Sequence, residues 1–245
     1  MNLFEGKRAL VTGTASGIGR AIAQALAKEG ATVLGCDIDG KAGEAARVAG
    51  LLFVAADLSN DAGQDALLAQ ARQRLGTIDI FVHSASPKRH EDQTIFAVTD
   101  QQWDQMVNIN LRAGFRLGRA LGIDMRAQGS GNMLYITSHH ANTPRHLPHY
   151  SASKGALQML VRELAKALAP HGVRVNAIAP GAIGGGGFMP SPAMAAKIPM
   201  KRLGTPDDVA QAALSLLNDK CNAYVTGVTL VVDGGLGLYN WIDPT

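Results

Sequence analysis

Short runs of hydrophobic residues alternate along the chain with longer segments in which hydrophobic residues recur every three or four positions. The short runs favour strands, and the longer amphipathic segments favour helices. The predicted strands span residues 8–13, 31–37, 51–57, 78–84, 132–138, 173–180 and 228–235. The predicted helices span about residues 17–29, 40–49, 61–75, 99–127, 150–169 and 206–217.

Regular alternation of strand and helix predicts an α/β fold in which a parallel sheet carries helices on both faces. We therefore expect a doubly wound (Rossmann) sheet of seven strands. No internal repeat and no linker divides the chain, so residues 1–245 are predicted to form a single domain for dinucleotide binding and catalysis.

Composition excludes several classes of protein. The chain of 245 residues has a net charge of +3 and no long basic run, which argues against a nucleic-acid partner. No run of hydrophobic residues is long enough to span a membrane, and the amino-terminal residues lack the hydrophobic core of a signal peptide. Cys36 and Cys221 suggest no disulfide framework, so we expect a cytoplasmic protein with no membrane partner.

A glycine-rich turn follows the first predicted strand. Glycine lets the backbone turn tightly and lets a pyrophosphate approach the amino terminus of the next helix, where free N–H groups favour anions. Its place between a strand and an amphipathic helix makes this turn a strong candidate for dinucleotide binding. The candidate cofactor residues here are Gly13, Ser16, Gly17, Ile18 and Gly19.

Asp37 ends the second predicted strand. In a doubly wound sheet, an acid at this place accepts hydrogen bonds from the adenosine ribose and repels a 2′-phosphate. Positions 14–16 and 38 hold no Arg or Lys for such a phosphate. We therefore predict NAD rather than NADP; the alternative is that Asp37 only begins a turn. Asp57 and Leu58 follow the third strand, where the adenine edge would lie.

Tyr150 and Lys154 are separated by three small residues at the start of a predicted helix. Residues four apart share one helix face, so an incidental surface pair is one interpretation. The other is catalytic. An alcohol that gives a hydride to a nicotinamide must also lose its hydroxyl proton, which a tyrosine accepts only as phenolate. Tyrosine has an ordinary pKa of about 10, and a nearby ammonium group favours the phenolate.

Taken together and in order, these motifs resemble those of the short-chain dehydrogenases/reductases of the compact single-domain kind. The resemblance runs from Lys7 to Gly235 and includes the glycine turn at 12–19 and the Tyr-x-x-x-Lys motif. It also matches the family's catalytic serine, the asparagine of its long middle helix and its Pro-Gly turn after the sixth strand. These matches fall on Ser138, Asn110, and Pro180 with Gly181.

The resemblance implies a role for each of four catalytic residues. Tyr150 would be the general acid/base, and Lys154 would lower its pKa and bind the nicotinamide ribose. Ser138 would bind the reacting oxygen, and Asn110 would hold a water that links Lys154 to solvent. Without the resemblance, Ser138 and Asn110 are equally well explained as an ordinary turn residue and an ordinary polar helix residue.

Two departures from the family pattern concern the cofactor. The family usually has Asn-Asn-Ala-Gly after the fourth strand, whereas this chain has His83 to Ser86. Backbone contacts around His83 and Ala85 would survive, but the side-chain support must differ. After Pro180-Gly181 the family often has a threonine, and here only backbone groups around Ile183 remain. Four glycines at 184–187 suggest either a mobile lid or a plain flexible loop.

Six of the seven histidines lie in residues 83–90 and 139–149, together with several basic residues. Both segments follow strands at their carboxyl ends, where ligands bind in such sheets. We predict no metal, because the spacing is loose. Solvated loop charge is the main alternative to a pocket for a polar, anionic substrate. The predicted substrate-binding residues are Lys88, Arg145, His149 and Trp241.

The sequence thus predicts an NAD-dependent oxidoreductase that acts on a secondary alcohol or ketone of a small polar substrate, such as a sugar, a sugar acid or a hydroxy/keto acid. The alternatives are a 3-oxoacyl carrier reductase or hydroxyacyl dehydrogenase and, outside enzymes, a non-catalytic dinucleotide-binding protein. The family is commonly tetrameric, so we expect a homotetramer, with an ordered tail at 236–245 that reaches a neighbouring subunit.

Overall fold

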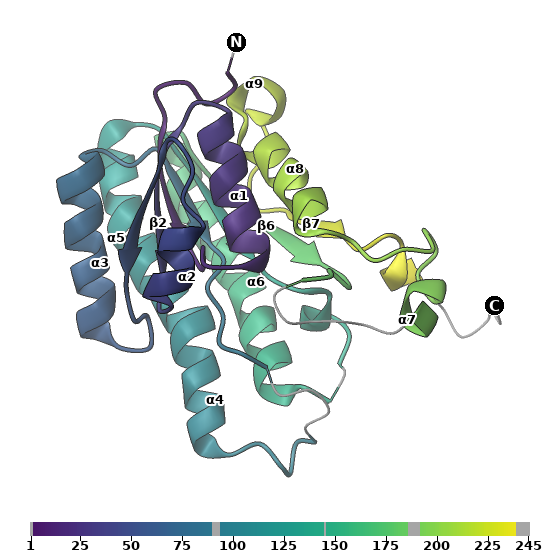
Figure 1. The fold of residues 1–245 in the computed structure, drawn as a ribbon. Helices are drawn as coiled ribbons and strands as arrows, with labels where there is room; N and C mark the ends of the chain where they lie inside the picture. Colours follow the sequence, from purple (N-terminus) through teal and green to yellow (C-terminus); the bar gives the residue numbers. More distant parts are fainter. Residues whose placement is uncertain (1, 90–93, 145, 186–191, 239–245) are drawn as a thin grey trace.

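The computed structural model describes residues 2–89, 94–144, 146–185 and 192–238 (Figure 1). Within them, seven strands form one parallel sheet in the order β3-β2-β1-β4-β5-β6-β7. The strands are β1 (Arg8–Thr12), β2 (Thr32–Asp37), β3 (Leu51–Ala55), β4 (Ile80–His83), β5 (Gly131–Ile136), β6 (Val173–Pro180) and β7 (Thr229–Val232). The predicted seven-stranded doubly wound sheet is confirmed.

Helices follow the strands in alternation. They are α1 (Gly17–Lys28), α2 (Gly40–Ala45), α3 (Asp61–Leu75), α4 (Asp100–Val107), α5 (Ala113–Gln128), α6 (Pro148–Leu168), α7 (Pro192–Ala196), α8 (Pro206–Leu217) and α9 (Asp219–Asn222). The short helical turns are η1 (Asn108–Arg112), η2 (His139–Ala141), η3 (Ala169–His171) and η4 (Leu236–Leu238). Helix α2 ends at Ala45 and is therefore shorter than the predicted 40–49, and the chain turns at Gly50, whose φ is 81°, before it enters β3.

The sheet buries hydrophobic residues on both faces, which is why its strands are hydrophobic throughout. In β1, Leu10 packs into the core beneath α3, α5 and α6, whereas Ala9 and Val11 pack into the core beneath α1 and α8. Figure 1 shows α3 and α5 on one side of the sheet and α1 and α8 on the other. Alternation along each strand therefore places successive side chains in different cores.

The strand order reverses between β1 and β4, which are neighbours in the sheet although separated by two strands in the chain. Thr12 of β1 pairs in register with His83 of β4, and His83 pairs with Tyr135 of β5. At such a reversal the connections after the two strands diverge and leave a crevice for a ligand. The loops after β1, β2, β4, β5 and β6 all open at this edge.

The predicted helix at 99–127 is present, but a π-helical turn interrupts it. A Thr99/Gln102 capping box starts α4, and α5 ends at Gly129 with a left-handed φ of 70°. Between them lies η1, a π-helical segment of five residues that includes Asn110. A π turn adds a residue to the helical repeat and often occurs at functional sites. Here it turns the carbonyl groups of residues 109 and 110 toward β4.

Candidate active site

The glycine turn after β1 leaves no room for a side chain at Gly13 or Gly19. Gly13 has a φ of 78°, and a Cβ there would lie 2.8 Å from the backbone nitrogen of Ala85. A Cβ on Gly19 would run into the carbonyl oxygen of Gly13. The turn therefore packs directly against the loop after β4 and against the first turn of α1. This close packing explains why glycine is required at both positions.

Hydrogen bonds tie the same turn to the end of β2. The backbone N–H groups of Gly13 and Thr14 both donate to the carbonyl oxygen of Cys36, at 2.8 and 3.1 Å. Asp37 accepts from Ala15 N through Oδ2 at 2.9 Å and from Asp39 N through Oδ1 at 3.1 Å. Its carboxylate thus lies against the glycine turn and also shapes the turn after β2. Both interpretations of Asp37 made from the sequence fit this geometry.

The remaining predicted cofactor residues lie along the same edge of the sheet. Asp57 accepts from Ser59 N at 2.9 Å and stabilises the turn after β3, while Leu58 is buried. Gly181 follows β6, and a Cβ on it would lie 2.5 Å from Cβ of Asp233. Ile183 forms an isolated parallel bridge with Gly204. These contacts fix the backbone after β3 and β6.

His83 is fully buried, and its ring connects the cofactor turn to the π-helical segment. Nδ1 lies 3.1 Å from the Thr12 hydroxyl, and Nε2 lies 3.2 and 3.1 Å from the carbonyl oxygens of Ile109 and Asn110. Thr12 Oγ1 accepts from Ser84 N and Ala85 N, so its hydrogen is directed to Nδ1. Nε2 then carries the ring proton and donates to the carbonyl groups.

Burial and, to a smaller extent, the charge of Lys154 lower the pKa of His83 to about 4. A neutral ring is the form that the hydrogen bonds require, because a charged ring could not accept from Thr12. Both ring nitrogens of His83 are therefore hydrogen-bonded to protein groups. The sequence had placed His83 among the cofactor residues, and the structure leaves only its backbone to meet a dinucleotide.

Tyr150, Ser153 and Lys154 lie in the first turns of α6, and their side chains are buried. Ser153 Oγ donates to the carbonyl oxygen of Tyr150 at 2.8 Å and accepts from Asn110 Nδ2 at 2.9 Å. Lys154 Nζ donates to the carbonyl oxygen of Ile136 at 2.8 Å. The structure therefore joins Asn110 to the helix of Tyr150. Ser153, which the sequence showed only as a small residue, makes this connection.

Ser138 follows β5 two residues beyond Ile136 and is 5% exposed. Its hydroxyl accepts from His140 N at 3.1 Å and starts η2, which packs against α6. The four predicted catalytic residues thus come from η1, from the segment after β5 and from α6, and the elements η1 and η2 both pack against α6.

Lys154 is buried beside the Tyr150 ring, with Nζ 5.7 Å from the ring centroid. Burial and, to a smaller extent, the positive charge of Arg89 lower the pKa of Lys154 to about 7. Arg89 itself lies over the same ring, with its guanidinium carbon 4.8 Å from the centroid. The sequence placed Arg89 with Lys88 and Arg145 among the basic residues of the predicted substrate pocket, but its stacking on Tyr150 is a tertiary contact that the sequence does not show.

The predicted substrate residues have different positions. Lys88 is exposed in the loop after β4, and His149 is buried with 2% of its surface exposed. Arg145 and Trp241 lie outside the described residues, as does most of the predicted tail. Among the described residues, no three His, Cys, Asp or Glu side chains come together in a way that could hold a metal ion.

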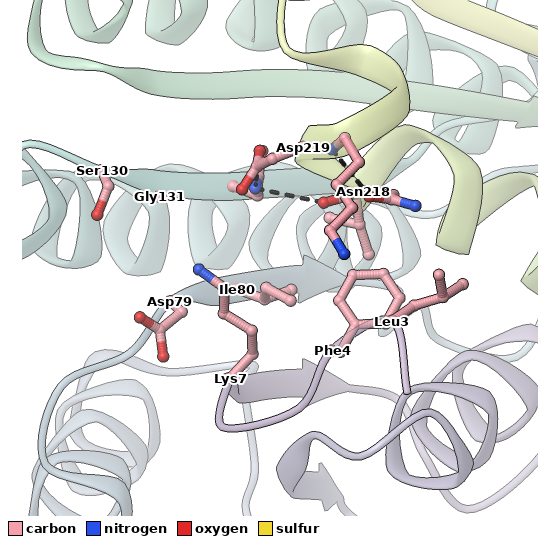
Figure 2. Close-up of a pocket in the computed structure, with 12 residues that line it drawn as sticks. Leu3, Phe4, Lys7, Asp79, Ile80, Ser130, Gly131, Asn218 and Asp219 are labelled. Atoms are coloured by element: carbon pink, nitrogen blue, oxygen red, sulfur yellow. Dashed lines mark hydrogen bonds between the residues drawn. The ribbon is translucent and has the colours of Figure 1, made fainter. Parts of the chain in front are cut away.

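Two hollows are lined by none of the four predicted catalytic residues. One, of about 130 Å³, lies near the amino ends of β1, β4 and β5 and is lined by Phe4, Lys7, Asp79 and Asp219 among others (Figure 2). It is at the opposite end of the sheet from the glycine turn. The other, of about 400 Å³, lies at the start of α6. Its lining is mainly hydrophobic and consists of Thr94, Ile95, Phe96, His146, Leu147 and Pro148.

Comparisons with known proteins agree with this architecture. The family model described as "Enoyl-(Acyl carrier protein) reductase" matches residues 13–237. Glucose 1-dehydrogenase 2 of Bacillus subtilis is 36% identical, with 96% of each chain covered. The 3-oxoacyl-[acyl-carrier-protein] reductase FabG of Escherichia coli is 33% identical, with 95% of this chain and 98% of FabG covered.

A solved structure shows the same likeness. The 3-ketoacyl-(acyl-carrier-protein) reductase from Brucella melitensis, complexed with NADH, superposes with a TM-score of 0.89 at 34% identity. The match covers 96% of this chain and 99% of that one. The chain belongs to the short-chain dehydrogenase/reductase family, and it is an oxidoreductase that acts on CH–OH or keto groups with a nicotinamide cofactor. In the described residues, no helix is long and hydrophobic enough to cross a membrane.

Proposed function

We propose that this protein is an NAD-dependent dehydrogenase that transfers a hydride between the nicotinamide and a secondary alcohol or ketone of a small polar substrate. The observation that carries the proposal is the buried chain of hydrogen bonds from Asn110 through Ser153 to the Tyr150 carbonyl, with Lys154 buried beside the Tyr150 ring. A protein that only bound a dinucleotide would have no need of this buried polar network.

The residues at the carboxyl edge of the sheet fit a dinucleotide. The turn from Gly13 to Gly19 admits no Cβ at its tightest points, and it opens onto the amino terminus of α1, where backbone N–H groups favour phosphate. The carboxylate of Asp37 borders this turn. An acid at that place suits the two free hydroxyls of the NAD ribose and repels the 2′-phosphate of NADP. When bound, NAD accepts or delivers the hydride.

Each catalytic residue acts on a proton or a developing charge. Tyr150 takes the proton of the substrate hydroxyl as the alcohol is oxidised and returns it in the opposite direction. Ser138 donates a hydrogen bond to the reacting oxygen. Lys154 supplies a positive charge beside the ring of Tyr150, and opposite charges favour one another's ionised forms. Asn110 anchors its helix to that of Tyr150 through Ser153 and borders the path by which the proton reaches solvent.

A 3-oxoacyl reductase or hydroxyacyl dehydrogenase is the second candidate. The hydrophobic hollow at the start of α6 favours it, because residues 94–96 and 146–148 would suit an acyl chain. The relative from Escherichia coli carries such a name. Against it stands Asp37, because reductases of this kind typically use NADP.

A substrate screen with both cofactors tests the proposal. Purified protein is assayed at the absorbance of reduced nicotinamide with sugars, sugar acids, hydroxy acids and 3-hydroxyacyl thioesters. Turnover of a small polar alcohol with NAD supports the leading function, and turnover of acyl thioesters alone supports the second. Binding of NADH without turnover of any substrate would contradict both functions and would support a non-catalytic dinucleotide-binding protein.

We also propose that the protein assembles as a homotetramer in a reducing compartment, with Cys36 and Cys221 as free thiols. Support comes from β7, an edge strand whose hydrophobic side chains are exposed: Leu230 to 39% and Val231 to 51%. Exposed hydrophobic edges are usually covered by a partner. Val231→Asp should reduce the mass of the assembly in sedimentation, and a wild-type monomer would contradict the proposal.

A further inference from the structure

His139 follows Ser138 directly, and its ring faces the segment after β7. Its Nδ1 lies 3.8 Å from Oδ2 of Asp233, which is within ion-pair distance. The side chains of His139 and Asp233 are 17% and 9% exposed, so most of the pair is shielded from water. The contact therefore joins the segment after β5, which carries a predicted catalytic residue, to the segment after β7.

Backbone groups hold the carboxylate of Asp233 in place. Its Oδ1 accepts from Gly235 N at 2.8 Å, and its Oδ2 accepts from Gly237 N at 2.7 Å. Both N–H groups belong to the segment that leads from β7 into η4. A Cβ on Gly181, in the turn after β6, would lie 2.5 Å from Cβ of Asp233. Asp233 is thus a point of contact for the segments that follow β5, β6 and β7.

Gly237 packs directly against the ring of His139. A Cβ on Gly237 would lie 3.1 Å from Cε1 of His139 and 3.0 Å from Oδ2 of Asp233, which is closer than most Cβ contacts in proteins. In a close-packed contact of this kind, displacement of one group shifts its neighbours. The position of the His139 ring is therefore coupled to that of η4.

A hydrogen-bonded turn connects His139 to the catalytic serine. Ser138 Oγ accepts from His140 N at 3.1 Å, and the carbonyl oxygen of Ser138 accepts from Ala141 N at 3.0 Å. The carbonyl oxygen of His139 accepts from Thr143 N at 3.2 Å. Ser138 is the residue at which η2 begins, so a contact that fixes His139 also fixes the start of this turn.

We infer that His139 is a positioning residue. Held by Asp233 and Gly237, it fixes the turn that begins at Ser138 and so sets the place of the Ser138 hydroxyl. The segment after β7 thereby becomes part of the support of the active site. The catalytic consequence rests on the role proposed for Ser138, whereas the coupling between the two segments does not depend on that role.

Hydrogen–deuterium exchange of the full-length protein tests the coupling without any substrate. One set of reporters is the amides of residues 140–143, and the other is the amides of Gly235 and Gly237. His139→Leu removes the ring nitrogens, and His139→Asn puts an amide nitrogen in the place of Nδ1. Gly237→Ala presses on the ring from η4. The control is His171→Leu, because His171 is also a half-buried histidine in a short 3-10 turn but precedes β6.

His139→Leu should raise the exchange rates of both sets of amides by about 3- to 10-fold, as expected when a shielded ion pair and its packing are lost. His139→Asn should restore part of the protection in both sets. Gly237→Ala should raise exchange in residues 140–143, although the substitution lies in another segment. His171→Leu should leave both sets unchanged.

Kinetics with a substrate found in the screen give a second readout. His139→Leu should lower kcat about 10-fold and leave KM and the affinity for NADH within about twofold, because Ser138 acts on charge that develops in the transition state. His139→Asn should recover part of kcat. A merely structural role for His139 would lower the Tm without this selective loss of kcat.

The inference is overturned if His139→Leu or Gly237→Ala changes exchange only in its own segment. It is also overturned if exchange rises in both segments while kcat stays at the wild-type value. The proposed function fails separately. If the wild-type protein turns over no substrate, the dehydrogenase is removed, and the exchange rates still decide whether the two segments are coupled.

Discussion

Replacing His83 by phenylalanine removes the polar connection between the cofactor turn and the π-helical segment while nearly filling the same space. The imidazole makes one hydrogen bond with Thr12 and shares another between the carbonyl groups of Ile109 and Asn110. Each is worth about 1 kcal/mol net, and each buried group left without a partner costs about 1–3 kcal/mol. We expect the free energy of unfolding to fall by about 2–4 kcal/mol at pH 7.5.

The substitution should also change how stability depends on pH. The pKa of His83 is lowered to about 4 in the folded protein, whereas an exposed histidine has a pKa of about 6.5. Between these values the unfolded chain binds more protons than the folded one, so wild-type stability falls as the pH falls. From pH 7.5 to pH 5 this effect amounts to about 2 kcal/mol, and His83→Phe should lack it.

Urea unfolding at pH 7.5 and pH 5, at one fixed protein concentration, measures both effects. Tyr135→Phe is the matched control, because Tyr135 is equally buried and donates a single hydrogen bond to the carbonyl oxygen of Gly114 at 3.1 Å. That variant should lose about 1 kcal/mol and keep the wild-type pH dependence. With an active substrate, only His83→Phe should lower kcat, by about 10- to 100-fold, as Asn110 shifts. Unchanged stability and pH dependence in His83→Phe would refute the assigned hydrogen bonds.

Three further variants test the site. Tyr150→Phe should lower kcat by about 10²- to 10⁴-fold while NADH binding by fluorescence stays unchanged, and near-wild-type turnover would contradict the role of the phenol. Asp37→Ala should reduce the preference for NAD over NADP in kcat/KM. Equal use of both cofactors by wild-type protein would contradict the assignment of Asp37 to the adenosine ribose. Cofactor-free wild-type protein should become more stable between pH 7 and about 10.5, because unfolded Lys154 keeps a proton that the folded side chain releases near a pKa of about 7. Lys154→Met should lose this rise in thermal or urea unfolding, and an identical rise would show that Lys154 is not its source.

The elements that the sequence predicted well are those whose signal is local. Strands buried on both faces are continuous hydrophobic runs, so β1, β2 and β6 could be located without any tertiary information. The glycine turn is also partly local, because a Cβ on Gly19 would meet the carbonyl oxygen of Gly13 only six residues earlier, whereas the approach of Gly13 to Ala85 depends on the fold.

What the sequence could not provide are contacts between distant segments. The pairing of Thr12 with His83 joins residues far apart in the chain, and no periodicity marks the π-helical turn around Asn110. The sequence predicted backbone contacts to the cofactor around His83, and it could not show which protein groups the His83 ring would meet. Arg89 was predicted only as one of several basic residues near the substrate, since nothing in its neighbours shows that its guanidinium stacks on the Tyr150 ring.

The rings of His83 and Tyr135 are accommodated by two glycines in α5. A Cβ on Gly114 would lie 3.0 Å from Cδ2 of His83, and a Cβ on Gly118 would collide with the hydroxyl of Tyr135. Two glycines one turn apart therefore let α5 approach the large rings of β4 and β5, which pack with centroids 6.0 Å apart. Close approach of the helix is what brings the carbonyl groups of η1 within reach of Nε2. The histidine, the glycines and the π turn thus form one structural unit, and its position sets that of Asn110 relative to Tyr150.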